Sequence, residues 1–259
     1  MVRKVGLMVV LATLAVACTK SATSGQTSPP PARSGGSTAP SANPSPASGN
    51  LADLQLVQAN FVDRIDNPWL PFIPGTTLTY HGIRDGKAAV DVVEVTSDTK
   101  VINGIRCVTV KDTLTLDGVL AERTEDWYVQ DVNGNVWYFG EATAELNANG
   151  EVTSTTGSWQ AGVDGAVPGI FMPADPQQGM SFQQEYLAGQ AEDRFVVLHQ
   201  LGKVQVPYGS FQNTLVTAEW TPLEPDVLSE KFYVKGIGQV KELDVAGGNE
   251  RTALASITK

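Results

Sequence analysis

Alternating polar and apolar residues, interrupted by Asn-Gly and Asp-Gly pairs, dominate the sequence from residue 76 onward. A period of two residues places successive side chains on opposite faces of a β-strand. Runs such as "VDVVEVTS", "RCVTVKDTLTL", "RFVVLHQL" and "KFYVKG" have this period and are rich in Val, Thr, Tyr and Phe. Asx-Gly pairs between such runs favour tight hairpins, and they occur at 85–86, 103–104, 117–118, 133–134 and 149–150. The pattern therefore predicts an antiparallel β-meander.

The β-rich region also repeats itself with an offset of 104 or 105 residues. The anchor pairs are Gly75 and Gly179, Val93 and Val197, Gly104 and Gly209, Tyr128 and Tyr233, and Val136 and Val240. A near-constant offset favours two similar halves, about 75–159 and 179–257. Hairpins of similar length can produce the same spacing by chance, which is the alternative.

One segment departs from the two-residue period. In residues 51–63, "LADLQLVQANFVD", Leu54, Val57 and Phe61 lie three to four residues apart, which predicts a short N-terminal helix. The predicted fold class is all-β: an antiparallel meander with an internal two-fold repeat, forming a barrel-like or sandwich domain over residues 51–259 with that helix at its start.

The N-terminal residues predict export. Arg3 and Lys4 precede the apolar run "VGLMVVLATLAVA", which is too short for a permanent transmembrane helix. Its end, "LAVAC", resembles a bacterial lipobox, which predicts a signal peptide over 1–17 and a lipid on the sulfur of Cys18. An ordinary signal peptide cut near the same point is the alternative.

Composition separates a tether from the folded region. Residues 18–50 are mostly Ser, Thr, Pro, Ala and Gly, a composition that predicts a disordered, lipidated tether. All 28 acidic residues of the chain lie in 51–259, with 14 of its 18 basic residues. This excess of negative charge argues against a nucleic-acid partner. It indicates either a solvated acidic surface, which we favour, or a cationic or metal partner.

Prolines every third residue mark "NPWLPFIPG" (67–75), with Trp69, Leu70, Phe72 and Ile73 between them. The second half has a counterpart in "VPGIFMPADPQQ" (167–178). Because proline lacks an N–H group, such segments suit the edge or end of a sheet. They would pack as an apolar plug over an open end of the β-structure, or would form the rim of a pocket; a PxxP recognition strand is a third, weaker interpretation. The candidate rim residues are Trp69, Phe72, Ile73, Phe171 and Met172.

Other chemistry-bearing residues give no site. Cys107 lies in a strand-like run and predicts a buried structural thiol, and the spacing of His81 and His199 predicts no metal site. "DVNGNV" (131–136) has the oxygen donors of a calcium loop without its later residues, so a hairpin is favoured. Neighbouring carboxylates such as Glu125-Asp126 and Glu192-Asp193 point to opposite faces of a strand, so most are predicted to be solvated. We predict no catalytic residue, no metal and no cofactor.

Four blocks, "IDNPWLPFIPGTTLTYHG", "DWYVQDVNGNVWYFGE", "GIFMPADPQQGMSFQQEY" and "KFYVKGIGQVKEL", resemble a family of bacterial secreted proteins and lipoproteins over nearly all of 61–244. The resemblance implies export and a single β-rich domain, and it supplies no catalytic residue.

The sequence thus predicts an exported lipoprotein of the cell envelope, lipid-anchored to a membrane and facing outside the cytoplasm. Its predicted role is a non-enzymatic binding or scaffold module, with an apolar small molecule or an envelope protein as partner. The alternatives are a hydrolase-like enzyme of the cell envelope and a purely structural surface protein. An apolar cavity, titratable groups converging in a cleft, or a filled core would distinguish these three.

Overall fold

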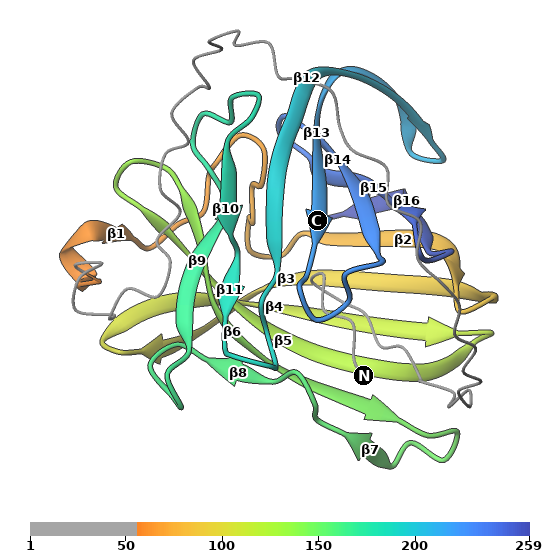
Figure 1. The fold of residues 1–259 in the computed structure, drawn as a ribbon, viewed down its shortest axis with the longest axis horizontal. Helices are drawn as coiled ribbons and strands as arrows, with labels where there is room; N and C mark the ends of the chain where they lie inside the picture. Colours follow the sequence, from red (N-terminus) through yellow and green to blue (C-terminus); the bar gives the residue numbers. More distant parts are fainter. Residues whose placement is uncertain (1–55) are drawn as a thin grey trace, which may run out of the picture.

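The computed structural model describes residues 56–259, and nearly all of this region is antiparallel β-structure (Figure 1). The all-β, barrel-like prediction is confirmed. The predictions for the signal peptide, Cys18 and the tether lie outside the described residues. Within 56–259 the structure contains no helix long and apolar enough to cross a membrane.

Five long strands form the first half: β2 (Thr77–Arg84), β3 (Lys87–Ile102), β4 (Ile105–Leu116), β5 (Val119–Asp131) and β6 (Val136–Leu146). Short strands follow: β7 (Val152–Ser154), β8 (Trp159–Gln160), β9 (Val167–Met172), β10 (Ser181–Gln183) and β11 (Glu185–Tyr186). The second half contains β12 (Arg194–Val206), β13 (Gly209–Trp220), β14 (Leu228–Val234), β15 (Gly238–Ala246) and β16 (Arg251–Thr258).

These strands form one sheet that nearly closes on itself. Its order is β10-β12-β13-β14-β15-β16-β2-β3-β4-β5-β6-β9-β11. The two ends, β10 and β11, are separated in the chain only by Gln184. A Cβ added at Gly169 of β9 would lie 2.0 Å from the carbonyl oxygen of Gln183. Only glycine therefore allows β9 to pack directly on the connection between β10 and β11, where the two ends of the sheet meet.

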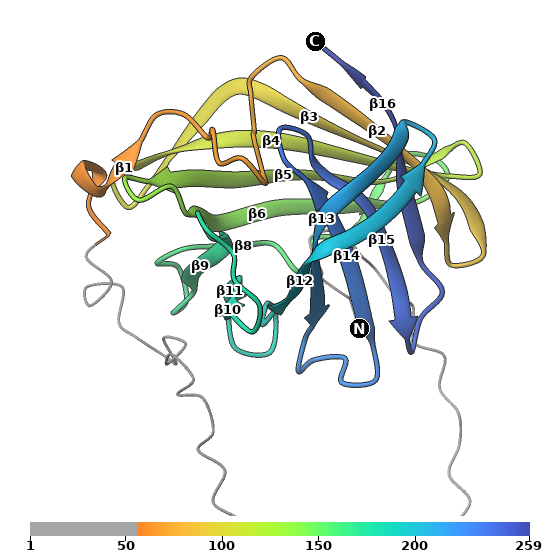
Figure 2. The same cartoon turned by 90° about the horizontal axis from the view of Figure 1, so that it is seen from above.

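The two halves form opposing walls that cross one another. Figures 1 and 2 show β2–β6 as one curved wall, with β12–β16 running across it. The pairing of β16 with β2 joins the walls along one side. Side chains on the inner faces meet in the interior, as in orthogonally packed β-structures.

The predicted turns explain the hairpins of the first half. In β2–β3, Arg84 pairs with Lys87, and the two residues between them, Asp85 and Gly86, have φ of 51° and 75°. Asn103-Gly104 and Asp117-Gly118 connect β3–β4 and β4–β5 in the same way, again with positive φ at both residues. Positive φ at both central positions is the geometry that Asx-Gly favours in a two-residue hairpin.

The predicted N-terminal helix is wrong over its described part, residues 56–63. Gln58–Asn60 forms a single 3₁₀ turn, and Phe61–Val62 forms strand β1, which pairs with Asp131 and Gln130 of β5. The Phe61 ring lies 5.8 Å from that of Phe139, edge to face. A helix this short is costly to nucleate, and strand pairing buries Phe61 instead.

The two halves share local features, although the duplication itself stays a prediction. Gly75 and Gly179 each donate their N–H at 2.8 Å, to the carbonyls of Val95 and Val197, so Val197 corresponds in this contact to Val95 rather than to the aligned Val93. The register also shifts at Tyr128 in β5–β6 and at Tyr233 in β14–β15.

The last anchor pair differs from the sequence alignment. The residue opposite no partner in these shifts is Phe139 in the first half and Val240 in the second. Val240 therefore corresponds to Phe139 rather than to Val136, because the strand ends and loop of the β5–β6 hairpin are together longer than those of β14–β15.

Candidate functional site: a cavity inside the β-structure

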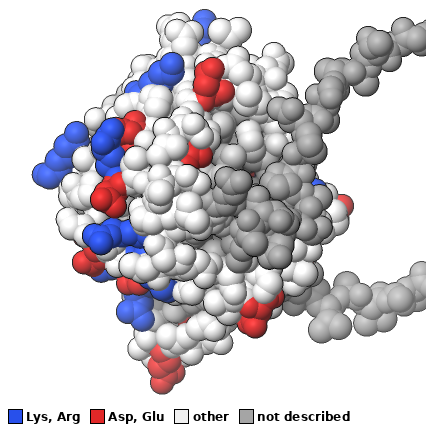
Figure 3. All heavy atoms as spheres, turned by 90° about the vertical axis from the view of Figure 1, so that its left-hand side faces the viewer, with Lys and Arg blue, Asp and Glu red and all other residues white. Residues whose placement is uncertain are grey.

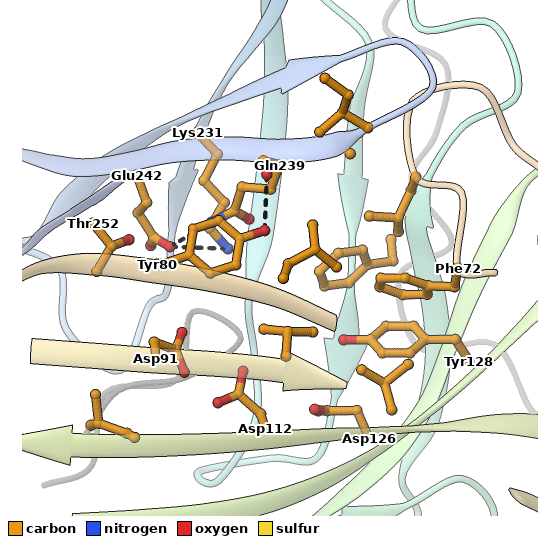
Figure 4. A pocket seen from close by; sticks show the side chains of 18 of the residues that line it. Phe72, Tyr80, Asp91, Asp112, Asp126, Tyr128, Lys231, Gln239, Glu242 and Thr252 are labelled. Atoms are coloured by element: carbon orange, nitrogen blue, oxygen red, sulfur yellow. Dashed lines mark hydrogen bonds and ion pairs between the residues drawn. The ribbon is translucent and has the colours of Figure 1, made fainter. Parts of the chain in front are cut away.

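A cavity of about 90 Å³ lies inside the barrel-like sheet (Figure 4). Its walls come from β2–β5 on one side and from β14–β16 on the other. One ordered water needs about 10–15 Å³ measured in this way. The space therefore accommodates several waters or a small organic group.

One end of the cavity is apolar. It is lined by Leu70, Pro71, Phe72, Tyr128, Phe171 and Ile237. The Tyr128 ring lies 5.0 Å from Phe72 and 5.1 Å from Phe171. Pro71, Phe72 and Ile237 are half-buried, so this apolar end is the side that approaches solvent.

Residues 67–75, here called the strap, cross this end of the β-structure. The Asn67 side chain fixes the strap: its Oδ1 accepts from the Trp69 N–H at 2.8 Å, and its Nδ2 donates to the Gly134 carbonyl at 2.8 Å. The Gly236 N–H donates to the Pro68 carbonyl at 2.7 Å. These bonds join the strap to the loops that follow β5 and β14 and hold it over the cavity.

The predicted rim residues separate into three groups. Phe72 and Phe171 line the cavity. Trp69 and Met172 are buried in the hydrophobic core beside it, and Ile73 is 44% exposed. The strap therefore combines the two favoured interpretations, since Trp69 packs as a plug while Phe72 faces the cavity. Its counterpart differs: residues 167–172 form strand β9 within the sheet.

The other end of the cavity is polar, and it has two differently composed sides. The charged side chains that line the cavity are Arg84, Asp91, Asp112, Asp126, Lys231, Glu242 and Glu250. We call the side formed by β2–β4, with Arg84, Asp91 and Asp112, the aspartate wall. We call the side formed by β14 and β15, with Lys231 and Glu242, the lysine wall, and we include in it Glu219 of β13, which pairs with Lys231 but does not line the cavity.

The lysine wall is an ion-paired network. The Nζ of Lys231 lies 2.8 Å from Glu219 Oε2 and 4.0 Å from Glu242 Oε2, with the lysine 1% exposed. Burial lowers the pKa of Lys231, but the carboxylates of Glu219 and Glu242 outweigh burial and raise it overall. Lys231 therefore stays an ammonium group at neutral pH and does not act as an amine nucleophile.

The aspartate wall contains a carboxyl pair. Asp91 and Asp112 are diagonal neighbours on β3 and β4, because Asp91 pairs with Leu114 and Asp112 with Val93 (Figure 4). Burial raises the pKa of both carboxyls, and the negative charge of Asp91 raises that of Asp112 further. Such a pair shares one proton, because two adjacent buried carboxylates repel each other.

The same wall has buried polar atoms with no hydrogen-bond partner. These atoms are Oδ1 of Asp91, Oδ1 of Asp112 and Nη2 of Arg84. The Nε of Arg84 lies 3.6 Å from Glu250 Oε2, so only part of the guanidinium is engaged. Leaving a buried polar group unpaired costs about 1–3 kcal/mol. The aspartate wall is therefore where a bound molecule would gain most.

In each neighbouring carboxylate pair one member is buried and the other is not, so the expectation that most of them are solvated holds only for Glu125 and Glu192. Asp126 and Asp193, one from each neighbouring pair, are 6% and 2% exposed. Among the described residues, ten acidic side chains are buried and only two basic ones, Arg84 and Lys231. On the face shown in Figure 3, Lys and Arg lie among Asp and Glu along one margin, so the surface there is mixed in sign.

The remaining predicted features lie away from the cavity. Cys107 is buried, as predicted, and burial raises the pKa of its thiol to about 12. His81 and His199 are exposed.

The 131–136 loop has the hydrogen bonds of a hairpin. Oδ1 of Asp131 accepts from the N–H groups of Asn133 and Asn135, and Oδ2 accepts from the Trp137 indole. These oxygens are thus used inside the loop. Across residues 56–259, no cluster of three or more His, Cys, Asp or Glu is suited to hold a metal.

Comparison with known proteins gives little further information. No family model and no curated protein matches the chain. Similar solved structures include a protein from Bacteroides fragilis described as exported, with a YmcC-like fold, at 15% identity and a TM-score of 0.42; the match covers 74% of this chain and 99% of that one. Another is described as a lipoprotein from Parabacteroides distasonis, at 11% identity and a TM-score of 0.39, covering 74% and 100%. At these TM-scores neither likeness carries an argument about this chain.

Proposed function

We propose that the protein is an exported, membrane-tethered binding module that holds a small amphipathic molecule in its interior cavity. The observation that carries the proposal is the composition of the cavity. Aromatic and aliphatic side chains line the end nearer solvent, and charged groups with unpartnered atoms line the other end. Ligand sites typically combine an apolar lining with a few convergent polar groups.

The location in this proposal comes from the sequence. The signal peptide over 1–17, the lipobox ending at Cys18 and the tether to residue 50 together describe a chain that stands off a membrane outside the cytoplasm. The resemblance to bacterial secreted proteins and lipoproteins supports the same location. Cys18→Ala would then move the protein from the membrane fraction to the soluble fraction, and unchanged membrane association would contradict the lipid anchor.

The polar end of the cavity modifies the expectation of a purely apolar ligand. An oil-like molecule would leave Asp112 Oδ1 and Arg84 Nη2 unpaired in a dry site, which is unfavourable. A molecule with one apolar part and one polar part satisfies both ends. A purely structural protein would fill this space with side chains, because interiors are normally close-packed.

A hydrolase-like enzyme is the second candidate, and the Asp91–Asp112 pair is the observation that favours it. Two carboxyls that share a proton can serve as acid and base towards one water. A hydrolase would turn over a bound ester, amide or glycoside, whereas a binding module would release it unchanged. Mass analysis of such compounds after incubation with the protein distinguishes the two.

Native mass spectrometry tests the binding proposal. The full chain with Cys18→Ala, purified from its own host without detergent, should carry a non-covalent small molecule that denaturation releases. The matched control is Val93→Phe, which places a larger side chain at a position lining the cavity and should remove the adduct. A spectrum that shows only the mass of the bare chain, or an adduct that survives Val93→Phe, would contradict a ligand in the cavity.

A further inference from the structure

We propose that the polar end of the bound molecule is a cation, and that the cavity selects an amphipathic amine whose ammonium group contacts the carboxyls of Asp91 and Asp112. This inference rests on the proposed function and names the ligand class for the same cavity.

The first support is the balance of charge around the cavity. Five carboxyl groups line it, those of Asp91, Asp112, Asp126, Glu242 and Glu250, against two basic groups, those of Arg84 and Lys231. Lys231 is already paired with Glu219 and Glu242, and Arg84 with Glu250. Among the described residues neither Asp91 nor Asp112 has a basic group within ion-pairing distance, although Arg84 acts on Asp91 from further away. A cation in the cavity would supply a charge close to the pair.

The second support is independent of charge. Asp112 is 8% exposed, lines the cavity and has an oxygen, Oδ1, without a hydrogen-bond partner, and Asp91 has the same kind of oxygen. A carboxyl oxygen of this kind accepts a hydrogen bond, and an alkylammonium group donates up to three. A carboxylate or phosphate group would instead bring further negative charge and acceptor atoms to these acceptors.

The third support is the aromatic end of the cavity. Phe72, Tyr128 and Phe171 pack on one another and line the end of the cavity beneath the strap. An alkyl chain would lie against the cavity side of these rings. Arg84 Nη2, the remaining unpartnered atom, is suited to an acceptor such as a hydroxyl or carbonyl next to the amine.

The inference also predicts how binding depends on pH. Burial raises the pKa of Asp112, so a cation would have to displace the shared proton of the pair. The charged and titratable groups around Asp112 are Arg84 and Tyr80 on β2, Asp91 on β3, Glu122 and Asp126 on β5, Lys231 on β14, Glu242 on β15, and Glu250. Amine binding should therefore strengthen as pH rises through the raised pKa of the pair, with release of a proton to the buffer.

Titration calorimetry with three probes of matched size tests the ligand class. Hexylamine, hexan-1-ol and hexanoate share one alkyl chain and differ in charge. We expect the full Cys18→Ala chain to bind hexylamine at least tenfold more tightly than either of the other probes. Asp112→Asn should weaken hexylamine binding at least tenfold, while Glu94→Gln, an exposed carboxyl on the same strand as Asp91, should leave it unchanged.

The outcomes separate this inference from the proposed function. Tighter binding of hexanol or hexanoate, or unchanged hexylamine binding in Asp112→Asn, overturns the cationic ligand while the cavity remains a binding site. Binding of none of the three probes overturns both. A fold check by circular dichroism on each variant removes misfolding as an explanation, and Asp91→Asn provides a second variant of the same pair.

Discussion

The lysine wall and the aspartate wall differ in how the cost of burying their carboxyl groups is offset. Both bury carboxylates where water cannot solvate them. In the lysine wall, Lys231 lies within ion-pairing distance of Glu219 and Glu242, so the charges compensate each other. In the aspartate wall, Asp91 and Asp112 face each other with raised pKa values and share a proton instead.

This difference between the walls indicates that one stabilises the fold and that the other is suited to bind a ligand. A buried ion pair with a fixed partner resists change, because removing one member leaves an uncompensated charge. A carboxyl pair that shares a proton can exchange that proton for another cation without rebuilding its surroundings. We therefore assign the lysine wall to the stability of the fold and the aspartate wall to ligand binding. The following variants test this assignment, from the largest expected effect to the smallest.

Replacing the central lysine should have the largest effect on stability. Lys231→Met keeps much of the side-chain volume but leaves Glu219 and Glu242 buried without their cation, at a cost of about 3–5 kcal/mol in the free energy of unfolding. The matched control is Lys111→Met, since Lys111 is 42% exposed and 3.7 Å from Asp98; it should change stability by less than about 0.5 kcal/mol. Urea denaturation measures both. Equal small losses would show that the lysine wall is not structural.

Truncating the strap residue that faces the cavity should have an intermediate effect. Phe72 is half-buried and packs on Tyr128. A fully buried phenylalanine loses about 3–5 kcal/mol on truncation, and surface positions about 0.5. We expect Phe72→Ala to cost about 1–3 kcal/mol and to weaken ligand binding. Trp69→Ala, at a buried strap position, should cost more stability. The reverse order in chemical denaturation would contradict the arrangement of the strap.

Neutralising the aspartate pair should stabilise the protein. An aspartate with a raised folded pKa keeps its proton in a pH range where the unfolded chain, with a pKa of about 3.9, has lost it. Stability from this group is therefore highest at acid pH and falls as pH rises between the two pKa values. Asp112→Asn stays neutral and can donate a hydrogen bond to Asp91, so we expect this variant to be more stable than the wild type at pH 7.

The pH profile provides the control for that variant. Lys231 has a raised pKa, so its stabilising contribution is fully present below the ordinary lysine value of about 10.4 and is lost only above it. Between pH 4 and 8 the charge of Lys231 itself should therefore contribute a constant term. Thermal melts over this range should show a fall in the wild type that is smaller in Asp112→Asn. A loss of stability in Asp112→Asn at pH 7 would contradict the raised pKa.

The fold was largely predictable because its determinants are local. Asp85-Gly86, Asn103-Gly104 and Asp117-Gly118 fix their hairpins through backbone conformations that few other residue pairs adopt. The predicted helix over 51–63 was wrong where the structure describes it. The spacing of apolar residues in a short segment contains no information about a strand partner far along the chain. Phe61 pairs with β5 and packs on Phe139 of β6.

The cavity was only partly predictable. Phe72 and Phe171 could be proposed from their proline-rich segments, but the charged end could not, because its residues come together from strands far apart in the chain. A local signal did exist. Asp112 follows Val108 and Val110 and precedes Leu114 in the buried phase of β4. An aspartate at a position where the alternation of a strand predicts an apolar residue indicates a buried carboxyl. The same signal can be searched for in other β-rich sequences.

Carboxyl ¹³C NMR during a hexylamine titration tests the central claim most directly. It observes both walls in one sample, with Asp112→Asn and Glu242→Gln providing the assignments. The account predicts that the Asp91 and Asp112 carboxyl signals move towards the ionised position as the amine binds, while those of Glu219 and Glu242 stay in place. Movement confined to the lysine wall, or no movement in either wall at saturating amine, would contradict it.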